Sequence, residues 1–262
     1  MNRILFYGGG NIAQAIISGL LSSGVDKDFI FYIDRNNANQ LKLKKLGIKK
    51  YAASNDATDL IILCVKPKDA LDAYKTIAEN FSKPKVVSLV AGIGSNKYLS
   101  ISKDVKLVRG MPNTSSQHGM GITALLNVNA SKTLYRDIKK LFEKVGITLD
   151  VSNEKIINDF TGLIGSGPAY FYYLLKSYEK ALINMVDGDS KKTKIIMANL
   201  MSGIGESVRG DKSIDELIKS VASKRGTTEA GLRVMKAEKM TESFNKSIKA
   251  AMNRAKEISN ES

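Results

Sequence analysis

The strongest constraint on the fold of this chain is a cluster of glycines near its start. The residues Gly8-Gly9-Gly10-Asn11-Ile12-Ala13 follow the apolar run 4–7 and precede a helix-like stretch, 14–22. A strand, a glycine turn and a helix in this order are the context in which a G-x-G-x-x-(G/A) motif indicates a dinucleotide site. Gly8 permits the tight turn, Gly10 lets the backbone approach a pyrophosphate, and Ala13 lets the helix pack on the strand. The helix N-terminus offers free N–H groups to the phosphates.

The first part of the chain alternates short β-rich runs with helical ones. Strands are expected at 3–7, 29–33, 60–65, 86–89, 106–109 and 121–125, with helices near 11–22, 38–46, 68–79 and 132–145. Such alternation predicts a parallel sheet covered by helices on both faces. The fold class is therefore α/β, with an N-terminal Rossmann-like dinucleotide-binding domain over residues 1–151.

The pattern becomes purely helical from about residue 153. Helices are expected at 153–163, 169–185, 191–208, 214–220, 227–235 and 242–258. We therefore expect an all-helical C-terminal domain over residues 152–262. The helix that starts near residue 191 has a wide apolar surface, which suits a buried helix or a subunit interface.

The net charge of +14 arises from 40 Lys and Arg residues against 26 Asp and Glu residues. The lysines are spread along amphipathic segments, which is typical of a solvated face. We therefore expect a general attraction for anionic metabolites and no nucleic-acid partner.

Cysteine and histidine are scarce, because Cys64 and His118 are the only residues of their kinds. No soft metal site can be built from them, so we expect no metal. A lone cysteine in an apolar run fits a reducing compartment. No run approaches the roughly 18 apolar residues of a membrane span, and the start does not have the pattern of a signal peptide. We expect a cytoplasmic protein with no membrane partner.

The end of the second expected strand carries two residues that bear on the choice of cofactor. In a Rossmann unit, an acidic residue roughly twenty positions after the glycines binds the ribose diol, and a nearby Arg accommodates a 2′-phosphate. Asp34 favours NAD, whereas Arg35 leaves NADP open. Asp34 could instead be a turn residue and Arg35 a surface charge.

Two later clusters precede helices. Residues 165–170 read Gly-Ser-Gly-Pro-Ala-Tyr, and residues 223–232 read Ser-Lys-Arg-Gly-Thr-Thr-Glu-Ala-Gly-Leu. The second combines backbone N–H groups, two hydroxyls and two cations, which suits a small carboxylate. Each cluster could also be a helix cap alone. Because His118 is the only histidine, a His-based dehydrogenase dyad is hard to build unless His118 itself serves. A cyclic imine, which needs no strong base, fits better as the hydride acceptor.

These clusters, in this order, make the chain resemble the pyrroline-5-carboxylate reductase family, the last enzymes of proline synthesis. The resemblance runs nearly end to end. It is carried by the glycine turn 8–13, Val65-Lys66-Pro67, Val90-Ala91-Gly92, Arg109-Gly110-Met111-Pro112-Asn113-Thr114, Thr161-Gly162 with residues 165–170, and Gly226-Thr227-Thr228. The Met-Pro-Asn-Thr and Gly-Thr-Thr segments are much more specific than the glycine turn.

The resemblance implies reduction of 1-pyrroline-5-carboxylate to L-proline by NADPH or NADH, in a homodimer or larger homo-oligomer formed through the C-terminal helices. Hydride would cross the cleft between the domains. The implied cofactor residues, with those from the ribose-binding position, are Gly8, Gly9, Gly10, Asn11, Ile12, Asp34, Arg35, Asn55, Val65, Lys66, Ala91, Met111, Pro112 and Asn113. The implied substrate residues are Glu154, Gly226, Thr227 and Thr228, with Thr228 as the catalytic residue whose hydroxyl faces the ring nitrogen.

One departure from the family concerns the substrate loop. The family usually has Ser-Pro-Gly-Gly before the threonine pair, and here Lys224 and Arg225 replace the Pro and the first Gly. Arg225 either loses a permissive backbone position or places a new cation beside the substrate carboxylate. Two alternatives to the leading function remain: a reductase of a related cyclic imine acid, and a non-catalytic dinucleotide-binding protein.

Overall fold

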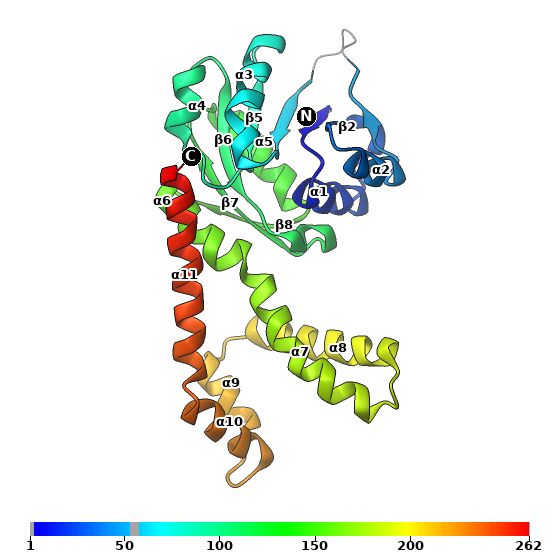
Figure 1. Cartoon of the computed structure of the whole chain (residues 1–262), viewed down its shortest axis with the longest axis vertical. Coiled ribbons are helices and arrows are strands. Elements are labelled where there is room, and N and C mark those ends of the chain that lie inside the picture. Colours follow the sequence, from blue (N-terminus) through cyan, green and yellow to red (C-terminus); the bar gives the residue numbers. More distant parts are fainter. Residues whose placement is uncertain (1–2, 53–57, 262) are drawn as a thin grey trace. The chain divides into compact units, whose positions relative to one another are not determined.

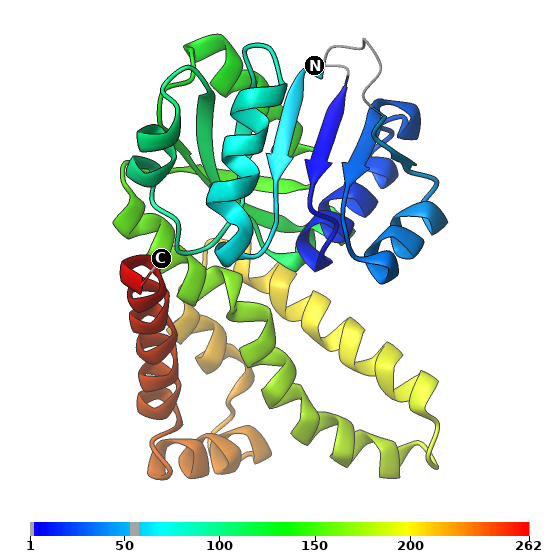
Figure 2. The same cartoon turned by 45° about the horizontal axis from the view of Figure 1, so that its top comes forward.

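The computed structural model describes residues 3–52 and 58–261, and its central element is one eight-stranded sheet. The strands lie in the order β3-β2-β1-β4-β5-β6-β7-β8 (Figures 1 and 2). Their bounds are β1 Ile4–Tyr7, β2 Ile30–Ile33, β3 Lys49–Lys50, β4 Leu60–Leu63, β5 Lys85–Ser88, β6 Lys106–Met111, β7 Gly121–Asn127 and β8 Gly146–Asp150. The expected Rossmann-like sheet is confirmed.

Helices cover both faces of this sheet because alternate strand residues point to opposite sides. Ile4 and Phe6 of β1 belong to the core beneath α1 (Asn11–Ser22), α2 (Asn37–Lys45) and α5 (Lys132–Glu143). Leu5 belongs to the opposite core, beneath α3 (Ala70–Asn80) and α4 (Ser95–Ile101). All four residues of β4 are buried, as in a central strand with helices on both sides.

One pairing differs from the parallel sheet that the sequence predicts. β6 and β7 are antiparallel, whereas each other neighbouring pair among the described strands is parallel. Only residues 112–120 join β6 to β7, including the short helix η3 (Thr114–His118). A parallel connection needs a crossover of a dozen or more residues, so this short link requires a reversal.

Three short elements were absent from the sequence prediction. β3 contains two exposed lysines, α4 contains seven residues, and β8 is a half-exposed edge strand. None of them has an apolar period long enough to distinguish it from a loop.

The helices that follow the sheet lie close to the ranges expected from the sequence. They are α6 Glu154–Phe160, a π-helical turn η4 at Thr161–Gly165, α7 Gly167–Met185, α8 Ser190–Val208, α9 Ile214–Val221, α10 Thr227–Ala237 and α11 Met240–Glu261. The chain separates into two compact units, residues 1–168 with 249–262, and residues 169–248. The sequence predicts a domain boundary between residues 151 and 152. The compact units do not follow this boundary, because α6 and the second half of α11 belong to the unit that contains the sheet.

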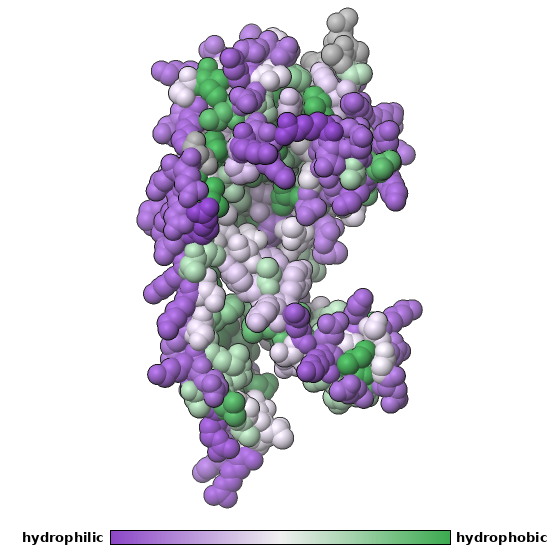
Figure 3. Space-filling model, in the orientation of Figure 1, coloured by the Kyte–Doolittle hydropathy of each residue, from purple (hydrophilic) through white to green (hydrophobic). Residues whose placement is uncertain are grey.

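The second compact unit has almost no core of its own. Among the described residues of α7, α8, α9 and α10, Thr193 alone is buried. Large apolar side chains are correspondingly exposed on these helices (Figure 3), including Tyr172, Tyr173, Met185, Ile195, Ile214 and Val234. A helical unit that leaves so much apolar surface uncovered requires another surface to pack against.

In the first compact unit, α11 packs closely against the π-helical turn η4 and forms an ion pair with α6. A Cβ atom placed on Gly162 would lie 2.5 Å from the backbone nitrogen of Met252, so only glycine fits there. The Asp159 carboxylate lies 2.9 Å from Lys155 Nζ and 3.2 Å from Lys256 Nζ. These ammonium groups, Lys155 first, hold the pKa of Asp159 below its ordinary value of 3.8.

The stabilising effect of Asp159 should therefore depend on pH. A carboxyl group with a lowered folded-state pKa stabilises the protein above its unfolded-state pKa, and the contribution disappears as the pH falls through the folded-state pKa. We expect Asp159→Asn to lower the melting temperature at pH 7 by about 1 to 4 °C, the range for a solvent-accessible ion pair. The gap between the two proteins should close below about pH 4. A gap of equal size at pH 7 and pH 3, measured by circular dichroism, would contradict this account.

Candidate functional site: a cavity at the carboxyl ends of the central strands

The candidate cofactor site lies where the strand order changes direction. The chain passes from β1 to β2 on one side of β1 and later returns to β4 on its other side. In open α/β sheets, ligands bind beyond the carboxyl ends of the strands at such a point. A cavity of about 670 Å³ occupies this position. Its walls include Gly8, Gly9 and Gly10 after β1, Asp34 and Arg35 after β2, and Val65 and Lys66 after β4.

The three glycines of the turn have different surroundings. Gly8 has a φ of +107°, and a Cβ there would lie 2.6 Å from the Cys64 carbonyl oxygen. A Cβ on Gly9 would lie 2.6 Å from Leu43 Cδ1. A Cβ on Gly10 would meet nothing within 4 Å, so its α-carbon faces open space. Open space at this turn, beside the first N–H groups of α1, fits the approach of a pyrophosphate.

Asp34 holds the glycine turn in place. Its Oδ2 accepts hydrogen bonds from the Gly9 N–H at 2.6 Å and from Asn39 Nδ2 at 3.0 Å. Its Oδ1 accepts the Asn36 N–H at 2.6 Å. Hydrogen bonds to an ionised carboxylate are stronger than neutral ones, so this residue fixes the β1–α1 turn against the end of β2. Asp34 therefore anchors the glycine turn, which a polar residue in an isolated surface turn would not do.

Arg35 forms an ion pair across the cavity. Its Nη2 lies 2.7 Å from Oδ2 of Asp69, in the short helix η2 (Pro67–Asp69). Asn36, the next residue, also lines this wall. The sequence analysis did not identify Asp69 or the other polar side chains of the wall, which are Asn39, Lys68, Asp72 and Thr76. The available signal was their place in the loops and helices that follow the predicted second and third strands, at the edge where ligands bind.

Cys64 forms part of the cavity wall but is held as a thiol. It is buried, and its Sγ donates a hydrogen bond to the Gly8 carbonyl oxygen at 3.1 Å. Burial, with a smaller contribution from the charge of Asp34, raises the pKa of this thiol above its usual range. Cys64 therefore acts as a small core residue beneath the turn, as the sequence indicated.

The remaining cofactor residues implied by the resemblance lie on several elements. Asn11 and Ile12 begin α1, Ala91 follows β5, and Asn55 lies outside the described residues. Met111, Pro112 and Asn113 are buried where β6 ends. Asn113 Oδ1 accepts the Ile122 N–H at 3.1 Å, so this side chain already joins β6 to β7. Of these residues, the six that the structure describes are not part of the cavity wall formed by the glycine turn.

Glu154 is engaged with a buried cation. Its Oε1 accepts the Ser95 N–H at 2.8 Å and lies 3.2 Å from Nε of Arg109. Only 1% of the Arg109 side chain is exposed, and its Nη1 donates to Ser88. Since a buried charge without a partner costs several kcal/mol, one role of Glu154 is to neutralise Arg109. The sequence analysis predicted Glu154 as a substrate residue and named Arg109 only within a family motif, and it did not predict their ion pair.

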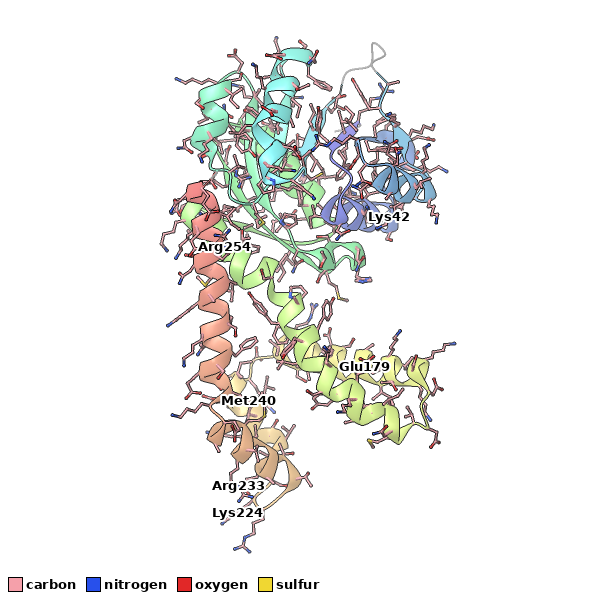
Figure 4. The ribbon with its side chains drawn as sticks, viewed as in Figure 1. Lys42, Glu179, Lys224, Arg233, Met240 and Arg254 are labelled. Atoms are coloured by element: carbon pink, nitrogen blue, oxygen red, sulfur yellow. The ribbon has the colours of Figure 1, made fainter. Side chains whose placement is uncertain are left out.

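The Gly-Thr-Thr segment lies in the second compact unit, at the start of α10. Gly226 is the N-cap residue, and no side chain caps this helix. Neither Thr227 nor Thr228 therefore caps this helix, in contrast to the alternative that a threonine serves only as its cap. Lys224 extends from the preceding loop (Figure 4) and is exposed.

Arg225 occupies a backbone conformation that normally favours glycine. Its φ is +61°, and its N–H donates a short hydrogen bond to the carboxylate of Glu229. The family's glycine at this position would adopt this conformation without strain. Arg225 therefore holds this conformation at an energetic cost.

Comparison with known proteins places the chain in a family. It is 32% identical to the pyrroline-5-carboxylate reductase of Haemophilus influenzae over 97% of each chain. It is also 32% identical to pyrroline-5-carboxylate reductase 2 of Bacillus subtilis, over 98% of this chain and 95% of that protein. A family model described as pyrroline-5-carboxylate reductase dimerisation matches residues 154–258, and one described as NADP oxidoreductase, coenzyme F420-dependent, matches residues 3–92.

Solved structures agree with this family. A pyrroline-5-carboxylate reductase from Coxiella burnetii covers 98% of each chain with a TM-score of 0.81 and 27% identity. The Plasmodium falciparum enzyme, solved with NADP bound, has a TM-score of 0.84 and shares the fold at 23% identity. The fold and site define an NAD(P)-dependent oxidoreductase of the Rossmann type. The chain belongs to the pyrroline-5-carboxylate reductase family.

The open space at Gly10 gives a direct test of the cavity. Gly10→Val should abolish binding of NADPH and NADH because the branched side chain occupies the approach to the turn. Its φ of −69° is accessible to any residue, so the variant should fold. Fluorescence titration measures the affinity, and circular dichroism verifies the fold. Unchanged affinity in a folded variant would exclude the glycine turn as the pyrophosphate site.

The conformation of Arg225 predicts an unusual stabilising substitution. Arg225→Gly should raise the free energy of unfolding by roughly 0.5 to 1 kcal/mol, because relief of the positive φ outweighs the added entropy of the unfolded chain. Arg225→Ala is the matched control, since it removes the same side chain but keeps Cβ. Urea unfolding at one protein concentration measures both variants. Equal stability of the Gly and Ala variants would show that the backbone at this position is not strained.

Proposed function

We propose that this protein reduces 1-pyrroline-5-carboxylate to L-proline with NADPH or NADH, the last step of proline biosynthesis. The observation that carries the proposal is the cavity at the glycine turn, in a chain that matches reductases of this substrate over nearly its whole length. The bound dinucleotide supplies hydride, which adds to the imine carbon of the substrate while a proton adds to the ring nitrogen.

The residues of the first compact unit provide the cofactor site. The N–H groups of Gly10, Asn11 and Ile12 at the start of α1 bind the pyrophosphate, favoured by the helix dipole. Asp34 and Arg35 face the adenosine ribose, and Val65, Lys66 and Ala91 continue the site along the strand ends. Met111, Pro112 and Asn113 support the nicotinamide end, and we assign Asn55 to the cofactor as well. Functionally, residues 1–151 bind the cofactor, and residues 152–262 bind the substrate and dimerise.

The residues of the second compact unit bind the substrate carboxylate. The backbone N–H groups of Thr227 and Thr228 lie in the first turn of α10, where they have no partner within the helix. Gly226, the N-cap residue, lets the substrate approach this turn, while its own N–H donates to the Ser223 carbonyl oxygen at 3.0 Å. The Thr228 hydroxyl, which caps no helix, is available to the ring nitrogen. From the first compact unit, Glu154 contributes through Oε2, since Oε1 is already occupied by Ser95 and Arg109.

A second copy of the chain completes the helical unit. The dimerisation model covers residues 154–258, and the helices α7 to α10 leave their large apolar side chains exposed. Burying this surface in a homodimer, or a larger homo-oligomer, removes it from water and supplies the missing core. We place the protein in the cytoplasm, in keeping with a single buried thiol and a small-molecule substrate. Within the described residues, no helix is both long and apolar enough to span a membrane.

Two alternatives are distinguished by steady-state assays. A reductase of a related cyclic imine acid would turn over a six-membered imine faster than the five-membered one. A non-catalytic binding protein would bind the cofactor yet reduce neither, and would not reduce NADP⁺ with L-proline at high pH. We expect the five-membered imine to have the higher kcat/KM. A clear preference for the six-membered ring would shift the assignment to that substrate class.

The role of Thr228 is tested by two substitutions. A positioned proton donor contributes about 10² to 10⁴ in rate, so Thr228→Ala should reduce kcat by that order with cofactor affinity intact. Thr228→Ser keeps the hydroxyl and should retain much of the activity. Steady-state kinetics and cofactor titration measure both effects. If the Thr228→Ala protein turned over at the wild-type rate, Thr228 would have a structural role only.

A further inference from the structure

The cation that would recognise an NADPH phosphate is already bound to an acid of the same cavity. Arg35 follows the end of β2, where the adenosine ribose binds in this fold. Its Nη2 lies 2.7 Å from Oδ2 of Asp69, and the Arg35 side chain is 79% exposed. The two residues come from separate walls, the loop after β2 and the short helix after β4. Lys66 and Lys68 line the cavity too, but neither forms an ion pair within the described residues.

The neighbouring acid is poorly placed to select between the cofactors. A carboxylate offers about four acceptor positions, and Asp34 uses three of them on Gly9, Asn36 and Asn39. A ribose diol presents two hydroxyl donors, so Asp34 cannot accept both without releasing a bond that holds the glycine turn. The choice between NADPH and NADH then depends on the groups that contact a 2′-phosphate. Among these groups, Arg35 is the nearest in sequence to the ribose position.

We propose that Asp69 is a specificity-determining residue that competes with the 2′-phosphate of NADPH for Arg35. A carboxylate and a phosphate bind the same guanidinium donors, so NADPH must displace Asp69 before Arg35 can contact it. NADH has no 2′-phosphate and leaves the ion pair intact. The Arg35–Asp69 pair therefore lowers the affinity for NADPH selectively and reduces the preference for NADPH over NADH. This inference rests on the proposed use of both cofactors.

The test uses binding without substrate. Asp69→Asn preserves the shape of the side chain and removes its charge. We expect the dissociation constant for NADPH to fall roughly two- to fivefold, the factor for loss of a solvent-accessible ion pair, with that for NADH nearly unchanged. In an Arg35→Ala background, Asp69→Asn should leave the ratio of the two dissociation constants unchanged. Fluorescence titration of each reduced cofactor gives these values.

A matched control separates competition for Arg35 from simple charge repulsion. Asp72 is an exposed acid of the same cavity and forms no ion pair within the described residues. Asp72→Asn removes the same charge, so it should change the NADPH to NADH ratio less than Asp69→Asn does. An equal change in both variants, or an effect of Asp69→Asn that persists without Arg35, would overturn the proposal.

Failure of the Asp69 proposal can be distinguished from failure of the proposed function. A protein that reduces the five-membered imine but shows no change of cofactor ratio in Asp69→Asn overturns this inference alone. A wild-type protein that binds neither cofactor overturns both. If Asp69→Asn shifts the ratio in a protein that reduces no imine, the cofactor inference stands and the assigned reaction fails.

Discussion

The hydrogen bond from the Gly9 N–H to the Asp34 carboxylate is the interaction on which the cofactor site depends. It ties the turn after β1 to the residue after β2, at 2.6 Å. The turn is also confined from the other side, because Gly8 packs against the Cys64 carbonyl after β4. The ends of β1, β2 and β4 thus hold the turn after β1 in place. This turn sets the direction of the N–H groups at the start of α1. The same hydrogen bond occupies Asp34, and for this reason our proposal assigns the choice between cofactors to Arg35 and its partner Asp69.

The elements that sequence predicts well are those with a strong local cause. The apolar runs of β1 and β4, the glycine turn and the helix over Asn11–Ser22 each follow from residues close together in the chain. What sequence did not predict depends on distant partners. The reversal at β7 depends on a short link rather than on strand composition, and β3 and β8 exist only because a neighbouring strand is there to pair with. The Arg109–Glu154 and Arg35–Asp69 pairs join residues 45 and 34 positions apart, a separation that no local pattern encodes.

The loop that we propose to bind the substrate carries an unusual residue directly before a regular helix start. Arg225 adopts a left-handed backbone that favours glycine, and the Glu229 carboxylate accepts its N–H. The residues that follow, Gly226 to Thr228, keep their place at the start of α10. These residues belong to a helical unit with almost no core of its own. We therefore expect packing against the partner chain to fix their position. Lys224 and Arg225 add two positive charges to this loop, and Arg225 adds backbone strain.

The most direct test of the central claim is the fate of the transferred hydrogen. Reduction of 1-pyrroline-5-carboxylate by NADPH that carries deuterium at C4 of the nicotinamide should give L-proline with a single deuterium on the former imine carbon, measured by mass spectrometry. Repeating the reaction with unlabelled NADPH in deuterated water should leave that carbon unlabelled. Absence of proline, or incorporation of solvent deuterium at that carbon, would contradict an imine reductase that works by hydride transfer.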